Sequence, residues 1–460
     1  MIRLIGNWRL PVFATIGFLS AAACLSICRA DAEEPKEEAT PFNFEEASRD
    51  VPKPRDIYQY VKRDMVPMEL RIISDEIVTS DTDPSKQLRK IAAQFNSLKL
   101  EGRTWCHPCV ILMPADASFN AAPVRKDRFV IVGSPGWAMF PAHVEKYGEP
   151  IAARTGYPTM VLNNPGIHPD GSEIEGENLK VLNRMREKTG TNFYNMNCQL
   201  ALVYIRAMDV LEKILGVDRV SAVIGGHSKR GRSATVAAAM DSRVASSIIM
   251  GNESVYRTDQ IQWHLSFHHA FFQDQVTVPV FYIGATNEGG YNMFGINLMQ
   301  ERLKDPMTVE MIPNYRHYNF HDVQYTDFMM WVAHIFDGRP ISKIVETGQE
   351  YRDGCHRYRA RIESEAKVQL VRVWYTYARN PQWRDLMWFE WLMVKRGDYY
   401  EASVPGRNPD AYMIEVADTA MGFPGYVTSL PIKLSDEPVQ DRLASEAGWM
   451  GPPEKGNQAR

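Results

Sequence analysis

Apolar runs alternate with helix-like segments over residues 128–336. Continuous apolar runs are typical of strands that are buried on both faces, and they occur at 128–136, 157–166, 220–226, 243–252, 278–288 and 307–314. Helices are expected between them, at 142–155, 198–216, from 229 to about 240, and near 258–272, 292–303 and 321–336. The clearest spans 198–216, where apolar residues recur every three or four positions along one face. This alternation predicts an α/β fold with a mostly parallel sheet flanked by helices.

The flanking regions have a different character. Strand-like runs at 68–79 and 99–114 suggest an antiparallel edge before the parallel strands. Alternating runs at 366–378, 387–405, 411–420 and 427–435 carry no long helical pattern, which predicts a C-terminal all-β sandwich. We therefore expect an α/β domain over 61–344 and a β-sandwich domain over 345–440. A loosely ordered lead-in is expected over 33–60, and a frayed tail over 441–460.

The N-terminus has the features of a signal peptide. Arg3 and Arg9 precede an apolar stretch over 10–27, and Ala30 and Ala32 form a small-x-small cleavage site. We expect residues 1–32 to be removed, which would place the chain in the periplasm or outside the cell. No later apolar run is long enough to span a bilayer, so the mature chain is expected to have no membrane segment.

The charge and the cysteines of the chain argue against a nucleic-acid partner and against a redox site. The formal charge of −4 over 460 residues gives no basic field for nucleic acid. Four cysteines follow residue 32, and "TWCHPC" contains the close pair Cys106 and Cys109. A redox pair needs its first cysteine at a helix N-terminus, whereas "VILMP" after this pair is strand-like. Buried thiols or a local structural disulfide are therefore favoured over a redox site.

The segment "VSAVIGGHSKRG" places a serine on a sharp corner between a strand and a helix. Such a corner lifts the hydroxyl of Ser228 clear of the sheet, and glycines are needed because a Cβ would clash there. The usual elbow is G-x-S-x-G, and here the second glycine comes one residue later. A capping role for Ser228 is the alternative.

An acyl-transfer serine requires a base and an acid that orients it. The chain order in α/β-hydrolases is serine, acid, histidine. His317 follows the last sheet strand and is the predicted base, with His321 second. Glu288 follows the penultimate strand and is the preferred acid, while Glu253, after the strand before it, is the alternative.

Further residues are assigned to anion stabilisation and substrate binding. The backbone amide of Lys229 and the loop at Gly136 and Trp137 are expected to form the oxyanion hole. Arg230 and Tyr291 are expected to contact substrate, and two cations beside the nucleophile favour an anionic group. The alternative is that one cation pairs with a structural acid.

A metal site has little support. His317 and His321 are four residues apart and would share a face if helical, but the segment is loop-like and no third ligand is evident. We therefore expect no metal and no cofactor.

Several motifs resemble one family. "GHSKRG", "RFVIVGSPGWAM", "IAARTGYPTMVLNNPGI", the ending "IPNYRH" and "YARNPQWRDLMW" are similar to the PhoPQ-activated pathogenicity-related proteins, which are exported and α/β-hydrolase-like. The resemblance covers scattered motifs over roughly residues 100–435. A serine followed by a basic residue also resembles glucuronoyl esterases, where the cation is thought to serve catalysis.

The resemblance implies Ser228 as nucleophile and His317 as base, with the two cations beside them. The chain departs from the family at Asn287, where an Asp is usual, and at His227, where the residue is usually small. Two functions follow as hypotheses: an exported serine hydrolase acting on a small-molecule or glycan ester, or a binding protein that kept the scaffold and lost the chemistry.

Overall fold

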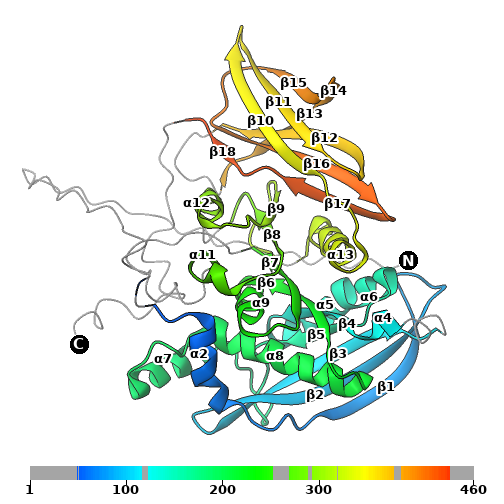
Figure 1. The fold of residues 1–460 in the computed structure, drawn as a ribbon, viewed down its shortest axis with the longest axis vertical. Helices are drawn as coiled ribbons and strands as arrows, with labels where there is room; N and C mark the ends of the chain where they lie inside the picture. The colour runs from blue at the N-terminus through cyan, green and yellow to red at the C-terminus, as the bar shows by residue number, and fades with distance from the viewer. Residues whose placement is uncertain are drawn as a thin grey trace, which may run out of the picture. The chain divides into compact units, whose positions relative to one another are not determined.

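The computed structural model describes residues 49, 51–116, 123–251, 269–288, 293–318, 320–377 and 385–435. The expected signal peptide and tail lie outside these ranges, as do residues 258–268 of one expected helix. A nine-stranded mixed sheet is the centre of the first part (Figure 1). Its strands are β1 (Arg71–Thr79), β2 (Gln87–Leu100), β3 (Arg103–Pro114), β4 (Arg128–Ser134), β5 (Thr159–Asn163), β6 (Ser221–His227), β7 (Val244–Met250), β8 (Val280–Ala285) and β9 (Thr308–Ile312).

The strand order is β1-β2-β3-β5-β4-β6-β7-β8-β9, and the six strands from β5 to β9 run parallel. The first three strands form an antiparallel edge that joins β5 through β3. This order confirms the expected α/β-hydrolase-type sheet. Since parallel strands end at the same edge, the residues after β6, β8 and β9 come together there.

Both faces of the parallel strands are covered, because side chains alternate along each strand. In β4, Phe129 and Ile131 join one apolar cluster, whereas Val130 and Val132 join another. The helical segments of this part are α2 (Pro54–Val61), η1 (Lys62–Asp64), α4 (Pro123–Lys126), α5 (Gly136–His143), η2 (Val144–Gly148), α6 (Glu149–Thr155), α7 (Asn178–Thr189), α8 (Met196–Leu215), α9 (Lys229–Met240), α11 (His269–Phe272), η4 (Gln273–Gln275), α12 (Gly295–Arg302) and α13 (Asp322–Asp337).

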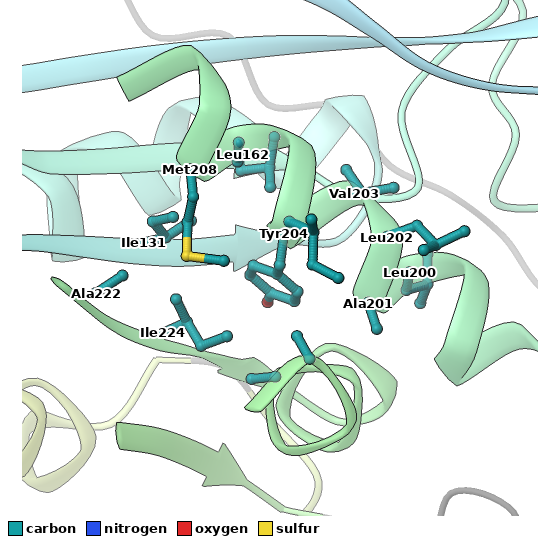
Figure 2. Packing of buried hydrophobic residues seen from close by; sticks show 14 of the residues in the cluster. Ile131, Leu162, Leu200, Ala201, Leu202, Val203, Tyr204, Met208, Ala222 and Ile224 are labelled. Carbon is teal, nitrogen blue, oxygen red and sulfur yellow. The ribbon is translucent and has the colours of Figure 1, made fainter. Parts of the chain in front are cut away.

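Helix α8 packs on the face of the sheet to which Phe129 and Ile131 point. Asn195 begins it by accepting a hydrogen bond from the Cys198 amide, and Gly216 ends it in a left-handed conformation. Tyr204 and Met208 face Ile131 and neighbouring strand residues (Figure 2). A fully buried side chain of this size contributes about 1.5–3 kcal/mol, so this contact fixes the sheet beneath the serine corner.

Several elements differ from the expectation. Residues 54–61, expected partly as loose lead-in, form α2, whose Ile57 and Val61 are fully buried in the core. Strand β2 and helix α7 were not expected, although Ile91, Ala93 and Phe95 are buried at alternating positions along β2. The helix expected at 142–155 begins earlier, at Gly136, and passes through a π-helical turn, η2.

The C-terminal part is a β-sandwich, as expected, but it begins with two strands that were not expected, β10 (Lys343–Arg352) and β11 (Cys355–Glu363). The other strands are β12 (Lys367–Thr376), β13 (Trp388–Leu392), β14 (Val394–Arg396), β15 (Tyr399–Pro405), β16 (Ala411–Ala420), β17 (Phe423–Thr428) and β18 (Ile432–Lys433). One sheet has the order β10-β11-β15-β14 and the other β13-β12-β16-β17, with β18 beside β16. Charged residues dominate β10 and β11, which hid their period.

The sandwich contacts the α/β part through β17, which lies beside α13 and β9 (Figure 1). The Met311 amide donates to Thr428 Oγ1 at 3.0 Å, and the Tyr426 amide donates to Asp327 Oδ1 at 2.8 Å. Buried Arg339 pairs with Asp418. These contacts make the described residues of the α/β part and of the sandwich one folded body.

The cysteines of the described region are free thiols. Cys106, Cys109 and Cys198 are buried, and Cys355 is half-buried. Burial raises the pKa of Cys109 and of Cys198 to about 12, so both stay protonated. None of the described helices is long and apolar enough to cross a membrane.

Candidate active site

Ser228 occupies the strained corner between β6 and α9. Its backbone has φ 60° and ψ −130°, a conformation that costs a non-glycine residue about 1–3 kcal/mol. The Ser228 amide donates to the Met250 carbonyl at 2.7 Å, and the Gly231 amide donates to the Ser228 carbonyl at 3.0 Å. No hydrogen bond from the Ser228 side chain caps α9. Ser228 therefore stands on a strained strand-to-helix corner, and its side chain does not cap α9.

Two glycines permit this corner. A Cβ on Gly226 would lie 2.7 Å from Arg230 Cβ, and one on Gly231 would lie 2.6 Å from the Gly226 carbonyl oxygen. The same Cβ on Gly231 would also lie 2.8 Å from the Cα of Ile249 in β7. The second glycine is therefore needed at position 231, because that is where the first turn of α9 meets the sheet.

His317 and Glu288 lie together at the carboxyl ends of β9 and β8. Nδ1 of His317 is 2.8 Å from Oε1 of Glu288, and the Glu288 side chain is 5% exposed. The two atoms are in close contact without hydrogen-bond alignment, and Oε2 of Glu288 has no hydrogen-bond partner in the described part of the chain. Catalytic hydrogen bonds are often poorly aligned in an unliganded enzyme. The preferred acid of the sequence analysis is thus the one that contacts the expected base.

His227 contacts His317 and directly precedes Ser228, so it lies between the His317–Glu288 pair and the serine corner. Its ring centroid lies 4.3 Å from that of His317. Gly251, after β7, leaves room for both rings, since a Cβ there would be 3.3 Å from His317 Nδ1 and 3.4 Å from His227 Nε2. Burial, then the charges of His317 and Arg230, holds the pKa of His227 well below its usual range. A neutral imidazole therefore packs against the predicted base.

Glu175 pairs with both cations beside the serine. Lys229 Nζ is 2.5 Å from Glu175 Oε1, and Arg230 pairs with Oε2 of the same carboxylate. Arg230 also donates to the Asn164 carbonyl at 2.8 Å, and its side chain is 4% exposed. Arg230 was expected to contact substrate, but in this arrangement it faces Glu175 and the backbone. Lys229, at 16% exposure, is the more accessible cation.

Burial and the neighbouring charges shift the pKa values of Lys229 and Glu175. Burial, then the charge of Arg230, lowers the pKa of Lys229 to about 8, although Glu175 acts in the opposite direction. Burial alone would raise the pKa of Glu175, but Arg230 and Lys229 outweigh it and lower that pKa. Lys229, Arg230 and Glu175 together carry a net positive charge next to Ser228.

The expected oxyanion loop begins α5. Gly136 has φ +52°, and Trp137 is the next residue. The Trp137 amide donates to Glu173 Oε1 at 2.9 Å, so a carboxylate already occupies this donor. The Lys229 amide begins α9 directly after Ser228. The assignment of all three residues to the oxyanion hole stays a prediction.

His321 is not part of the site. It begins α13, where its Nδ1 accepts a hydrogen bond from the Val323 amide at 3.2 Å. Within the described ranges, no group of three or more His, Cys, Asp and Glu side chains is placed to hold a metal ion. Glu253, the alternative acid, and Tyr291, an expected substrate contact, lie outside the described residues.

Sequence reasoning missed Glu173 and Glu175. Both belong to "DGSEIEGE", the loop between β5 and α7. Ile174 between them is 1% exposed and holds the loop in place. The available signal was two carboxylates in the loop that follows a parallel strand, which is where active-site loops lie.

Comparison with known proteins gives distant structural similarity. No model of a known family and no curated protein matches the sequence. A glucuronoyl esterase from Solibacter usitatus is 13% identical over 61% of this chain and 91% of its own, with a TM-score of 0.43. An acetyl xylan esterase from Paenibacillus sp. R4 is 14% identical over 64% and 99%, with a TM-score of 0.40. A cold-adapted esterase from an Arctic intertidal metagenomic library is 20% identical over 53% and 88%, with a TM-score of 0.35. Function is therefore argued from the geometry of the site.

Proposed function

We propose that this chain is a serine hydrolase that cleaves an ester. The observation that carries the proposal is the contact between His317 and buried Glu288, beside the His227 ring that precedes the strained Ser228. Strain at one serine, beside a histidine oriented by a carboxylate, is the arrangement of an activated nucleophile.

In this proposal His317 removes the hydroxyl proton as Ser228 attacks the ester carbonyl. Since Nδ1 of His317 faces Glu288, Nε2 is the nitrogen that accepts the proton. Collapse of the tetrahedral intermediate releases the alcohol, which takes that proton, and leaves an acyl-enzyme. Water then attacks the acyl group, His317 again acts as base, and the acid product leaves.

Substrate class and location belong to the same proposal. The net positive charge of Lys229, Arg230 and Glu175 favours an ester that carries an acidic group, such as a uronate or another carboxylated glycan. The N-terminal segment supports export, and the motif resemblance supports a relation to the PhoPQ-activated pathogenicity-related proteins.

The test is covalent labelling by a fluorophosphonate, which reacts only with an activated serine. We expect one adduct on Ser228 by peptide mass spectrometry, none in Ser228→Ala, and a rate at least 10³-fold lower in His317→Ala. Glu288→Gln is expected to lower the rate about 10³ to 10⁴-fold, because it removes the charge that stabilises the imidazolium. Full labelling in His317→Ala would contradict the assigned base.

One observation favours a second candidate, a binding protein without turnover. Glu173 holds the Trp137 amide, a donor that an oxyanion would need. A folded wild-type protein that takes no label would support this candidate over the hydrolase.

A further inference from the structure

The loops that carry the acid and the base are joined to each other. The Asn287 amide donates to the Tyr315 carbonyl at 3.0 Å. The Asn314 amide donates to Thr286 Oγ1 at 2.9 Å, and this hydroxyl donates to Asn287 Oδ1 at 2.7 Å. Glu288 and His317 extend from these two loops, so their separation depends on how the loops are held.

The β-sandwich holds both loops through a single short segment. Asn287 Nδ2 donates to the Leu386 carbonyl at 2.8 Å. Asn314 makes two bonds to Trp388, because its Nδ2 donates to the Trp388 carbonyl at 2.9 Å and its Oδ1 accepts from the Trp388 amide at 2.7 Å. The Asn314 side-chain amide thus forms with the Trp388 backbone the two hydrogen bonds that a residue of a neighbouring strand would form. We call these three bonds, which fix the loop ends to residues 386–388, the clamp.

This segment is itself rigidly held by the sandwich. Trp388 begins β13, is 2% exposed, and pairs with Thr376 of β12. Thr376 Oγ1 also donates to the Met387 carbonyl at 2.8 Å. The loops are therefore attached to a paired strand.

We propose that the β-sandwich positions the acid and the base, with Asn287 and Asn314 as positioning residues. This inference rests on the proposed function. It also gives the Asn287 side chain a role, because an Asp at this position would have no side-chain N–H to donate to the Leu386 carbonyl. The neighbouring Glu288 supplies the negative charge that faces His317. Acid–base catalysis is sensitive to displacements near 1 Å, which cost about 100-fold in rate.

Asn314 is the better residue to change. Its φ is 56°, a left-handed conformation that glycine adopts more readily than asparagine does. Asn314→Gly therefore keeps the loop backbone and removes both bonds to Trp388. The sandwich stays docked through its other contacts, which include those of Thr428 and Tyr426.

A matched control exists on α12. Asn297 Nδ2 donates to the Pro431 carbonyl at 2.8 Å, so it also joins the α/β part to a backbone carbonyl of the sandwich. It belongs to neither loop of the proposed triad. Asn297→Ala removes one side-chain hydrogen bond between the α/β part and the sandwich. It therefore tests whether weaker docking of the sandwich is enough to explain a rate loss in Asn314→Gly.

The experiment measures fluorophosphonate inactivation over a range of probe concentrations. We expect Asn314→Gly to lower the limiting rate constant about 10- to 100-fold with an unchanged half-saturating concentration, because the clamp positions the base and not the probe. Asn314→Asp, which keeps the acceptor and loses the donor, is expected to lie between Asn314→Gly and the wild type. Asn297→Ala is expected to react like the wild type.

Equal rates in Asn314→Gly and wild type, or an equal loss in Asn297→Ala, would overturn the inference. An unreactive wild type would instead reject the proposed function, and hydrogen exchange then decides the clamp by itself. Exchange of the Asn287 amide, which donates to the Tyr315 carbonyl, should quicken more than about tenfold in Asn314→Gly and stay unchanged in Asn297→Ala. Unchanged exchange in both variants would reject the clamp.

Discussion

At the scale of single residues, Lys229 is the most informative side chain of the site. It directly follows the predicted nucleophile, and its ammonium is the accessible part of the cation pair that Glu175 joins. Its pKa of about 8 lies close to neutral pH because the group is buried. The charge that would attract an acidic substrate is therefore present at pH 7 and is lost as the pH rises through about 8.

This predicts a pH-dependent preference for acidic esters. We expect KM for mono-p-nitrophenyl succinate to stay constant up to about pH 7.5 and to rise about tenfold by pH 9, whereas KM for p-nitrophenyl acetate stays flat. Lys229→Met should already show the higher succinate KM at pH 7, without the pH dependence. A succinate KM that does not change with pH in the wild type would argue against Lys229 as the substrate cation.

At the scale of elements, the serine corner depends on the close contact of α9 with β6 and β7. Gly231 lies where the helix meets the sheet, and a Cβ there would collide with backbone of Gly226 and of Ile249. Since backbone atoms cannot rotate away as a side chain can, α9 would have to shift. The same shift would move Ser228 at the N-terminus of the helix.

Gly231→Ala is thus predicted to lower the free energy of unfolding by about 1–3 kcal/mol, measured by urea denaturation. Gly176→Ala is the matched control, because a Cβ added to Gly176 would meet no atom within 4 Å and its φ is not positive. The control should lie within about 0.5 kcal/mol of the wild type. Similar stabilities for the two variants would mean that the corner is less tightly packed than these distances indicate.

At the scale of the whole molecule, the α/β part and the sandwich meet around buried carboxyl groups. Glu310 of β9 and Asp327 of α13 lie near Glu415 of β16, and Arg372 is the neighbouring cation that acts on Glu310. Burial, then repulsion from Glu415 and Asp327, holds the pKa of Glu310 well above its usual value. Burial is also the main cause that raises the pKa of Asp327.

These shifts predict that stability falls as the pH rises above about 4.5, the ordinary pKa of Glu. In that range the folded protein binds more protons than the unfolded chain, so each such group lowers the free energy of unfolding by about 1.4 kcal/mol per pH unit until its folded pKa is passed. Glu310→Gln cannot ionise and should reduce this slope between pH 5 and 8, measured by urea denaturation.

Glu301→Gln removes the same charge from an exposed position of α12 and is the control. It should keep the wild-type slope. An unchanged slope in Glu310→Gln would mean that this carboxyl is already ionised at the interface.

The sequence by itself determined the parallel strands, most of the helices between them, and their order. Strand and helix periods are properties of neighbouring residues, so the parallel strands, α8 and the serine corner could be read directly. The rule that parallel strands end at one edge then pointed to His317 and Glu288. In the structure, His317 Nδ1 lies 2.8 Å from Glu288 Oε1. Short or charged segments such as β10 and α7 lacked a period and were missed.

Only the tertiary structure decided which distant side chains meet. Glu175 reaches the two cations beside the serine across more than fifty residues of sequence. Glu173 accepts a hydrogen bond from the Trp137 amide, and Asn287 and Asn314 bind the segment 386–388 of the sandwich. Such contacts depend on how loops close over the folded sheet. A local sequence pattern does not predict these contacts, because packing of the folded chain, and not spacing along the sequence, decides which side chains meet.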